Sequence, residues 1–322
     1  MSKFDCIAIG ELLIDFIEGE KSPQGNPMYE ANPGGAPCNV LSMLGRLNKK
    51  TAFIGKVGND SFGNMLKDTI INQGIDASEL KKDDMVHTTL AYVHKLPDGD
   101  RDFSFYRNPG ADMCLTEDEI DENFCANTKI FHFGTLSMTH KEVKAATKKA
   151  VKAAKRAGAI ISFDPNLRPP LWENLDKARK AFDWGMSKCD ILKISDNEIQ
   201  WFTGCSDYTE GVKKIRESHN IGLILVTMGK DGSRAYVEDR MIEMPAYIQK
   251  DTVDTTGAGD TFCACALCYC LDHGFKFNEY TDEELKALLD FGNRAASIVT
   301  TRKGALKVMP TEEEVLTFFD TP

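Results

Sequence analysis

One short run in this chain combines residues that can bind an anion and accept a proton. Residues 254–260 are Asp254, Thr255, Thr256, Gly257, Ala258, Gly259 and Asp260, and an apolar helical stretch at residues 261–271 follows directly. Small residues that open a helix leave backbone N–H groups free, and the helix dipole favours negative charge at that end. The alternative is a glycine-rich turn with a purely structural role, capped by an aspartate. Such a turn would need only some of these seven residues. The full run predicts phosphoryl transfer, in which Asp260 accepts the proton of an attacking hydroxyl group.

Other common nucleotide-binding and hydrolytic motifs are missing from the sequence. Gly55-Lys56 and Gly229-Lys230 lack the rest of a Gly-x-x-x-x-Gly-Lys-Ser/Thr loop. No Gly-x-Gly-x-x-Gly follows the first apolar run, and neither His-Glu-x-x-His nor Gly-x-Ser-x-Gly occurs. These absences argue against a P-loop protein, a nicotinamide enzyme, a zinc protease and a serine hydrolase.

Strand and helix patterns alternate along most of the chain. Apolar runs that predict buried strands occupy residues 6–10, 52–57, 130–133, 159–163, 191–194 and 223–227. Amphipathic patterns that predict helices occupy residues 62–73, 141–157, 176–188, 198–203 and 209–218. This alternation predicts a doubly wound α/β fold with a mainly parallel sheet and flanking helices. Ligands of such sheets gather beyond the carboxyl ends of the strands.

Two regions interrupt the alternation and predict a small β-sheet lid. Residues 11–30 are rich in Gly, Pro and Asn, and residues 87–94 and 101–106 alternate apolar and polar side chains around a turn signal at residues 97–100. We expect lid strands from about residues 11–30 and 86–110, carried by a single domain that spans residues 1–322. A free apolar lid face would invite a partner subunit, which favours a homodimer formed through the lid.

Composition favours a globular enzyme over a nucleic-acid or membrane binder. The 322 residues are 42% hydrophobic and carry a formal charge of −10, whereas nucleic-acid binders normally present a basic face. No apolar run reaches the roughly 18–20 residues that span a bilayer. The N-terminal residues show no secretory signal, so we expect a cytoplasmic location. Cys263, Cys265, Cys268 and Cys270 would point to two sides of a helix, which predicts buried, reduced thiols instead of a zinc site.

Three segments together resemble the signatures of the ribokinase-like (PfkB) carbohydrate kinases. They are residues 254–260, residues 32–40 (Asn-Pro-Gly-Gly-Ala-Pro-Cys-Asn-Val) and residues 54–63 (Ile-Gly-Lys-Val-Gly-Asn-Asp-Ser-Phe-Gly). The resemblance covers essentially the whole chain and keeps the order of the motifs. Within the family, residues 10–16, 103–107, 110–112 and 164–172 are similar to fructokinase patterns. The resemblance implies a ribokinase-like fold, ATP and Mg²⁺ as cofactors, and a sugar as phosphoryl acceptor.

The resemblance also implies which residues would bind the sugar. Asp15, Gly34, Gly35 and Asn39 would meet the sugar hydroxyl groups, because a polyol needs several directed polar partners and glycine lets the backbone approach closely. Arg107 would descend from the lid over the sugar.

A second implied set would act on the phosphates. Asn166 and Arg168 would follow the strand at residues 159–163, with Arg168 neutralising charge on the transferring phosphoryl group. The amides of Gly257, Ala258 and Gly259 would form the anion hole. The other residues assigned to ATP, besides Gly257 and Gly259, are Lys193, Thr227, Gly229, Gly232 and Asn293.

The resemblance implies two kinds of metal site. Glu198 would organise Mg²⁺ through water, although Ser195 stands where many relatives have Asn, which weakens a direct role for residue 195. Backbone carbonyl groups near Asp254, Thr256 and Gly304 would hold K⁺, with residues 301–305 as the second loop of that site.

These features predict an ATP-dependent kinase that phosphorylates a primary hydroxyl group of a ketohexose, with D-fructose converted to fructose 6-phosphate. The nearest alternative keeps the fold and chemistry but uses 2-keto-3-deoxygluconate, ribose, another ketohexose or a nucleoside. A catalytically silent sugar sensor is a different class of protein. It would be expected to have lost the anion turn or the base, and this chain keeps both.

Overall fold

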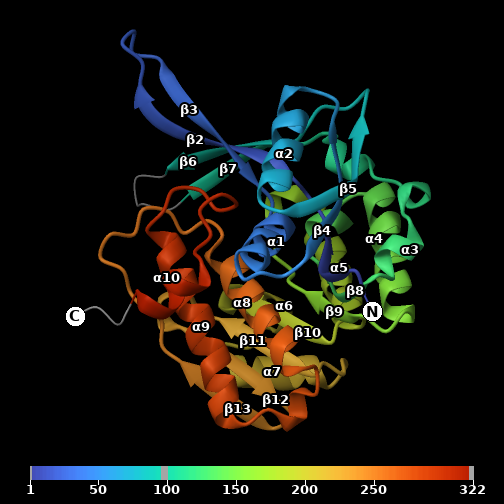
Figure 1. The fold of residues 1–322 in the computed structure, drawn as a ribbon, viewed down its shortest axis with the longest axis vertical. Helices are drawn as coiled ribbons and strands as arrows, with labels where there is room; N and C mark the ends of the chain where they lie inside the picture. Colours follow the sequence, from blue (N-terminus) through green and yellow to red (C-terminus); the bar gives the residue numbers. More distant parts are fainter. Residues whose placement is uncertain (1, 96–100, 319–322) are drawn as a thin grey trace.

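Two sheets organise the protein, which a computed structural model describes for residues 2–95 and 101–318 (Figure 1). The nine-stranded central sheet has the order β13-β12-β11-β10-β9-β8-β1-β4-β5. Its strands are β1 (Phe4–Ile9), β4 (Thr51–Gly58), β5 (Ile75–Asp83), β8 (Thr128–Phe133), β9 (Ile160–Phe163), β10 (Ile191–Ser195), β11 (Leu223–Thr227), β12 (Ser233–Val237) and β13 (Arg240–Met244). All neighbouring pairs are parallel except β11–β12 and β12–β13. The predicted mainly parallel sheet is confirmed.

Side chains of the central strands alternate between two hydrophobic cores, one on each face of the sheet. In β1, Cys6 and Ala8 belong to one core and Ile7 and Ile9 to the other. The first core is covered by α1 (Ala36–Arg46), α2 (Ser61–Asn72), α8 (Ala258–His273), α9 (Asp282–Thr300) and α10 (Glu312–Thr317). The second is covered by α3 (Glu122–Cys125), α4 (Lys141–Arg156), α5 (Leu175–Met186), α6 (Asp196–Thr203) and α7 (Tyr208–Arg216). Helices on both faces make the fold doubly wound.

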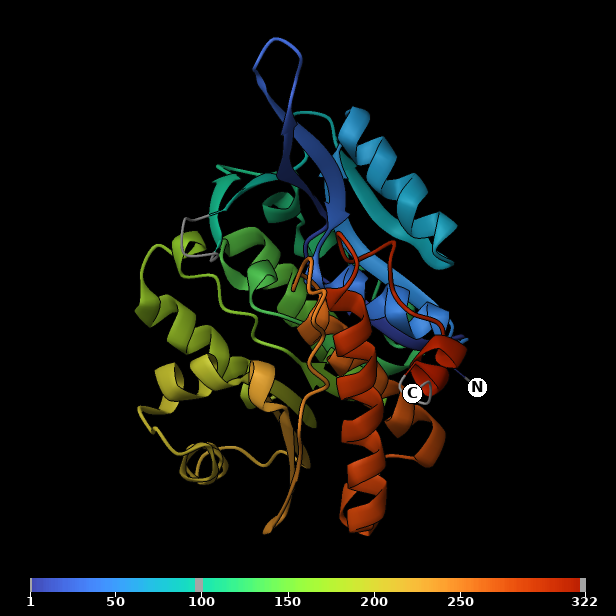
Figure 2. The ribbon, with the colours of Figure 1, turned by 90° about the vertical axis from the view of Figure 1, so that its left-hand side faces the viewer.

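The smaller sheet has four strands and projects from one end of the molecule (Figures 1 and 2). Its strands, in the order β3-β2-β6-β7, are β2 (Leu13–Lys21), β3 (Pro27–Gly34), β6 (Leu90–Lys95) and β7 (Arg101–Tyr106). They come from the two regions expected to form the lid, so the predicted small sheet is confirmed. The turn expected at residues 97–100 lies outside the described residues.

Helix α8 crosses the first core with side chains that are apolar nearly all round. Such a pattern is typical of a buried helix. Its cysteines at positions 263, 265, 268 and 270 are buried, as predicted from their spacing. Neither α8 nor any other helix of the described residues is long and apolar enough to cross a membrane.

Candidate active site

A cavity of about 350 Å³ lies where the carboxyl ends of the central strands meet the small sheet. Strand β10 contributes Lys193, the segment after β9 contributes Asn166 and Arg168, and the small sheet contributes Asp15 and Phe105. The predicted site residues that line this cavity are Asp15, Gly35, Asn39, Asn166, Arg168, Lys193, Thr256, Gly257, Gly259 and Asp260. Segments from both ends of the chain therefore meet here.

Asp260 occupies the first turn of α8 and is 8% exposed. Its Oδ2 accepts a hydrogen bond of 2.8 Å from Nδ2 of Asn39 in α1. Burial and the neighbouring charge of Asp164 raise the pKa of Asp260 to about 6, against the lowering effects of Asn39, Lys193 and Arg168. The carboxylate is therefore ionised at neutral pH, with a proton affinity close to the one that suits a general base.

The turn before Asp260 leaves the N-terminus of α8 open. Gly257 has φ 80° and ψ −1°, a left-handed conformation, and no side chain in the described residues caps the helix. A Cβ on Gly257 would come within 2.5 Å of Cβ of Ala305, so the close loop also requires glycine. The first N–H groups of a helix have no internal acceptor, and an uncapped end can bind an anion.

Lys193 adds a positive charge to the same end of α8. Its Nζ lies 3.1 Å from the position that a Cβ on Gly259 would take. Burial lowers the pKa of Lys193, but Asp164, Glu198 and Asp260 outweigh this effect and raise it. The ammonium group therefore stays charged beside the predicted anion hole.

The part of the cavity predicted to bind the sugar contains polar groups that can form further hydrogen bonds. Oδ1 of Asn39 is buried and has no partner in the described part of the chain. Burial raises the pKa of Asp15 to about 7, with Arg168 lowering it and Asp254 raising it further. Gly34 packs against this carboxyl group, since a Cβ there would approach Asp15 Oδ2 to 2.3 Å. Such groups suit a ligand that brings several hydroxyl groups.

Asn166 adopts a left-handed conformation, with φ 48°. Asparagine tolerates this region better than most residues, and strained backbone collects at functional sites. Asn166 and Arg168 both line the wall of the cavity.

Arg107 corrects the sequence-based expectation. Its Nε and Nη2 donate to Asp112 Oδ2 at 2.8 and 2.6 Å, and other bonds reach Thr139 and the carbonyl of Leu136. The side chains of Arg107 and Asp112 are each 2% exposed, and Arg107 does not line the cavity. The guanidinium group anchors the end of β7 to the segment after β8. Phe105, two residues earlier, faces the cavity instead.

Glu11 lines the cavity but was not among the predicted site residues. It is 4% exposed, and its Oε1 accepts a 2.9 Å hydrogen bond from the N–H of Ala36 at the start of α1. Burial raises its pKa to about 7. The available signal was its position, because Glu11 follows the first strand and so lies at the carboxyl end of that strand.

Three residues predicted to bind ATP form the turn after β11. Gly229 and Gly232 have φ values of 55° and 100°, and a Cβ on Gly232 would lie 2.1 Å from the carbonyl oxygen of Met244. Thr227 pairs with Ser233 across β11 and β12. This turn lies beside the strand that carries Lys193 but does not line the 350 Å³ cavity.

Asn293, expected on the adenine side, has both ends of its amide occupied. Its Oδ1 accepts from Ser233 Oγ at 2.9 Å, and its Nδ2 donates to the carbonyl oxygens of Met244 and Pro245. The side chain therefore fixes α9 to the segment after β13. The predicted position of Asn293 on the adenine side stays a prediction.

Glu198 forms a capping box with Ser195 at the start of α6. Its Oε2 accepts from the N–H and hydroxyl groups of Ser195, each at 2.9 Å, and its Oε1 accepts from the N–H of Leu167 at 2.6 Å. The carboxylate thus joins α6 to the segment that carries Asn166 and Arg168. Its predicted contact with Mg²⁺ through water stays a prediction.

The side chains around the cavity suit a metal ion that is bound together with the nucleotide. No group of three or more His, Cys, Asp or Glu side chains in the described ranges could enclose a metal. Magnesium binds enzymes with few protein ligands when nucleotide phosphates supply the others, so this donor set fits Mg²⁺ that arrives with ATP.

Asp254 links the two loops predicted to hold K⁺. Its Oδ1 accepts from the N–H of Thr256 at 2.8 Å, and its Oδ2 accepts from the N–H of Gly304 at 3.2 Å. Both loops are thereby held together, as a site made of carbonyl oxygens from each would need. The K⁺ site itself stays a prediction.

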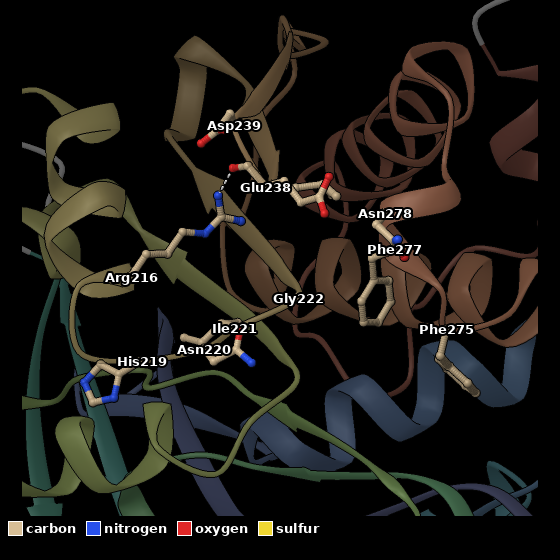
Figure 3. A pocket seen from close by; sticks show the side chains of 11 residues that line it. Arg216, His219, Asn220, Ile221, Gly222, Glu238, Asp239, Phe275, Phe277 and Asn278 are labelled. Carbon is tan, nitrogen blue, oxygen red and sulfur yellow. Dashed lines mark hydrogen bonds between the residues drawn. The ribbon is translucent and has the colours of Figure 1, made fainter.

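A second cavity, of about 430 Å³, lies at the opposite ends of the strands, where Gly222 precedes β11 (Figure 3). The guanidinium group of Arg216, which lines this cavity, already donates hydrogen bonds to the carbonyl oxygens of Glu238 and Tyr236. Ligands of doubly wound sheets bind beyond the carboxyl ends of the strands. The cavity around Asp260 is therefore the candidate active site.

A doubly wound sheet with a small separate sheet, and a buried carboxylate at an open helix N-terminus between them, is the architecture of a ribokinase-like kinase. The family model described as pfkB family carbohydrate kinase matches residues 3–312, so the chain belongs to this family of carbohydrate kinases.

Relatives and solved structures agree with this assignment. The chain is 38% identical to probable fructokinase-2 of Arabidopsis thaliana over 314 residues, covering 97% of this chain and 94% of the relative. It is 38% identical to fructokinase-2 of Solanum lycopersicum over 313 residues, again covering 97% and 94%. The crystal structure of a fructokinase with bound ATP from Xylella fastidiosa has a TM-score of 0.88 at 29% identity and covers 98% of each chain.

A fructokinase double mutant from Vibrio cholerae, solved with fructose, ADP and potassium, has a TM-score of 0.87 at 27% identity, covering 99% of each chain.

Proposed function

We propose that this carbohydrate kinase transfers the γ-phosphoryl group of ATP to a primary hydroxyl group of D-fructose, forming fructose 6-phosphate. Asp260 is the general base of this proposal. The observation that carries it is the buried Asp260 carboxylate on the open first turn of α8, hydrogen-bonded to Asn39. Proton acceptor and anion site then lie within one helical turn.

Similarity supports fructose as the acceptor. The plant relatives bear the name fructokinase, and the Vibrio cholerae structure holds fructose, ADP and potassium. The same similarity supports ATP, Mg²⁺ and K⁺, because one similar structure holds ATP and another, from E. coli, holds ATP and Mg²⁺. Bound Mg²⁺ would neutralise charge on the phosphate groups.

The proposed mechanism assigns one task to each group of residues. Asp15 and Asn39 orient the sugar so that its primary hydroxyl group meets Asp260, which takes the proton as that oxygen attacks the γ-phosphorus. The N–H groups at Gly257–Gly259, with Lys193 and Arg168, stabilise charge on the moving phosphoryl group. The small sheet limits access of water and so limits ATP hydrolysis.

An acceptor panel tests the substrate. Initial rates with MgATP would be compared for D-fructose, ribose, 2-keto-3-deoxygluconate, another ketohexose and a nucleoside. We expect kcat/KM to be highest for D-fructose. A higher kcat/KM for another acceptor would contradict fructose as the substrate but would leave the proposed kinase chemistry intact.

Substitution of the base tests the chemistry. Asp260→Asn keeps the size of the side chain and the bond to Asn39 but cannot take up the proton. We expect kcat to fall by about 10²–10⁴-fold, with the fold and fructose binding retained. Circular dichroism and fructose titration calorimetry provide the controls. Near-normal turnover in a folded Asp260→Asn variant would contradict the mechanism.

We further propose that the protein is a homodimer formed through the outer face of the small sheet. Phe16 and Tyr92 stack there at 4.9 Å, and Tyr29 and Tyr106 each lie 5.3 Å from Tyr92. Tyr106 is 66% exposed. Exposed clusters of aromatic side chains often mark the surface that binds another protein chain. The predicted cytoplasmic location stays a prediction, which cell fractionation would test.

A further inference from the structure

A buried ion pair lies next to the cavity on two neighbouring strands. The register pairs Phe163 of β9 with Leu192 of β10, so the next residues, Asp164 and Lys193, emerge side by side at the carboxyl ends. Lys193 Nζ lies 3.0 Å from Asp164 Oδ2, and the two side chains are 8% and 5% exposed. The parallel pairing of the strands therefore creates this ion pair.

Only one oxygen of Asp164 is used. Oδ2 meets Lys193, whereas Oδ1 is buried and has no hydrogen-bond partner in the described ranges. A buried carboxylate with an unsatisfied oxygen reduces the free energy of unfolding, and such groups call for a functional explanation. Stability alone does not account for an acid at this position.

Lys193 needs a partner to stay where it is. Lysine carries its charge on a flexible four-carbon chain, and nothing in that chain fixes the ammonium group. Here the group lies against the backbone of Gly259, at the anion turn. The carboxylate of Asp164 is the contact that holds it there.

We propose that Asp164 is a positioning residue that acts through Lys193, holding the ammonium group at the first turn of α8 where the transferring phosphoryl group binds. This inference rests on the proposed kinase function. It adds a residue that no part of the proposed mechanism has used.

The charge of Asp164 has a second effect, on the base. The groups that face Asp260 are Asp164 and Arg168 from the segment after β9, Lys193 from β10 and Asn39 from α1. After burial, the charge of Asp164 contributes most to raising the pKa of Asp260. An Asp164→Asn variant therefore combines a misplaced lysine with a base whose pKa is lower.

A double-mutant cycle with Asp164→Asn and Lys193→Gln tests the proposal. We expect Asp164→Asn to reduce kcat/KM for ATP by about 10- to 100-fold, because a small misplacement of a binding group has effects of this size. The acid limb of its pH–rate profile should move to lower pH. The double variant should be no worse than Lys193→Gln alone, since Asp164 acts through Lys193.

Unchanged ATP kinetics and an unchanged acid limb in folded Asp164→Asn, or losses that simply add in the double variant, would overturn the proposal. If Asp164→Asn does not fold, the double variant, in which both side chains are neutral, is compared with Lys193→Gln. A lower kcat/KM for ATP in the double variant than in Lys193→Gln would then overturn the proposal. A matched control is Asp112→Asn, which breaks the buried pair with Arg107 outside the cavity. It should lower the melting temperature but leave the ATP KM and the acid limb unchanged.

The affinity for a non-hydrolysable ATP analogue, which keeps a γ-phosphate and is measured by calorimetry without sugar, separates this inference from the proposed function. A wild-type protein that phosphorylates no sugar would contradict the function, while the double-mutant cycle with this analogue would still report whether Asp164 acts through Lys193. Equal affinities of wild type and Asp164→Asn for the analogue would contradict the positioning role even if fructose is the substrate.

Discussion

Asp260 and Asn39 show how a pair of residues can join distant parts of one chain into a reactive centre. The bond between them places the amide proposed to bind the sugar and the proposed base on adjacent helices, α1 and α8. The sequence motifs suggested both residues separately. Their direct contact comes from the packing of the two helices, which no local pattern contains.

The raised pKa of Asp260 predicts how activity depends on pH. As the proposed base, Asp260 must be ionised, so activity should be full above its pKa of about 6 and should be lost as the pH falls through it. We expect log kcat to fall with a slope of about one per pH unit on the acid side. Initial rates between pH 5 and 8 at saturating fructose and ATP would measure this limb.

Asp15 offers a control for that profile, because burial raises its pKa to about 7. An Asp15→Asn variant should bind fructose more weakly and keep the limb near pH 6 in kcat. A flat profile for the wild type between pH 5 and 8 would contradict the assignment of Asp260.

Single residues were also where the sequence misled. Arg107 is a polar residue in the right neighbourhood, yet it uses its donors on neighbouring protein groups and does not line the cavity. The type of a residue determines which hydrogen bonds its side chain can form. Which partners it finds depends on the packing of segments that are distant in sequence. Glu11 was missed for the same reason, since its role depends on the start of α1.

At the scale of elements, strongly periodic segments were predictable. The six predicted strands and five predicted helices occur in the structure with ends that differ by at most two residues. Strand β5 was missed because it lies at the edge of the sheet and alternates only weakly between buried and exposed residues. Helix α1 was missed because Gly35 and Pro37 suggest a loop, although proline is well tolerated in the first turn of a helix.

The capping box of α6 carries a prediction of its own. In Glu198→Gln one oxygen becomes an amide nitrogen, so one of the backbone N–H groups of Ser195 and Leu167 loses its acceptor. We expect the free energy of unfolding to fall by about 1–3 kcal/mol. The concentration of Mg²⁺ needed for half-maximal activity should change little, because the carboxylate already serves the backbone. Urea denaturation and Mg²⁺ titration would measure both.

Glu284→Gln is the matched control for Glu198→Gln. Glu284 forms the same capping box with Thr281 at the start of α9, but its carboxylate is exposed. The control should lose less stability and keep full activity. A raised Mg²⁺ requirement in Glu198→Gln without any loss of stability would assign this residue to the metal instead.

At the scale of the whole molecule, the small sheet predicts assembly. Tyr106→Lys places a charge in the exposed aromatic cluster and should shift the protein from dimer to monomer at micromolar concentration, as seen by sedimentation velocity. Met241→Lys is the control, because Met241 is a 41% exposed apolar residue on β13, at the opposite end of the molecule (Figure 1). A monomeric wild type, or equal sedimentation of both variants, would contradict the proposed dimer.

The sequence separation of 221 positions from Asn39 to Asp260 also bears on how the protein is made. Translation delivers the small sheet, α1 and β10 first, and α8 only near the end. Contacts between such distant positions form slowly, since a long loop must close before they can form. A nascent chain that has emerged as far as Lys193 therefore has neither the proposed base nor the proposed anion turn. We therefore expect chains that end before α8 to transfer no phosphoryl group.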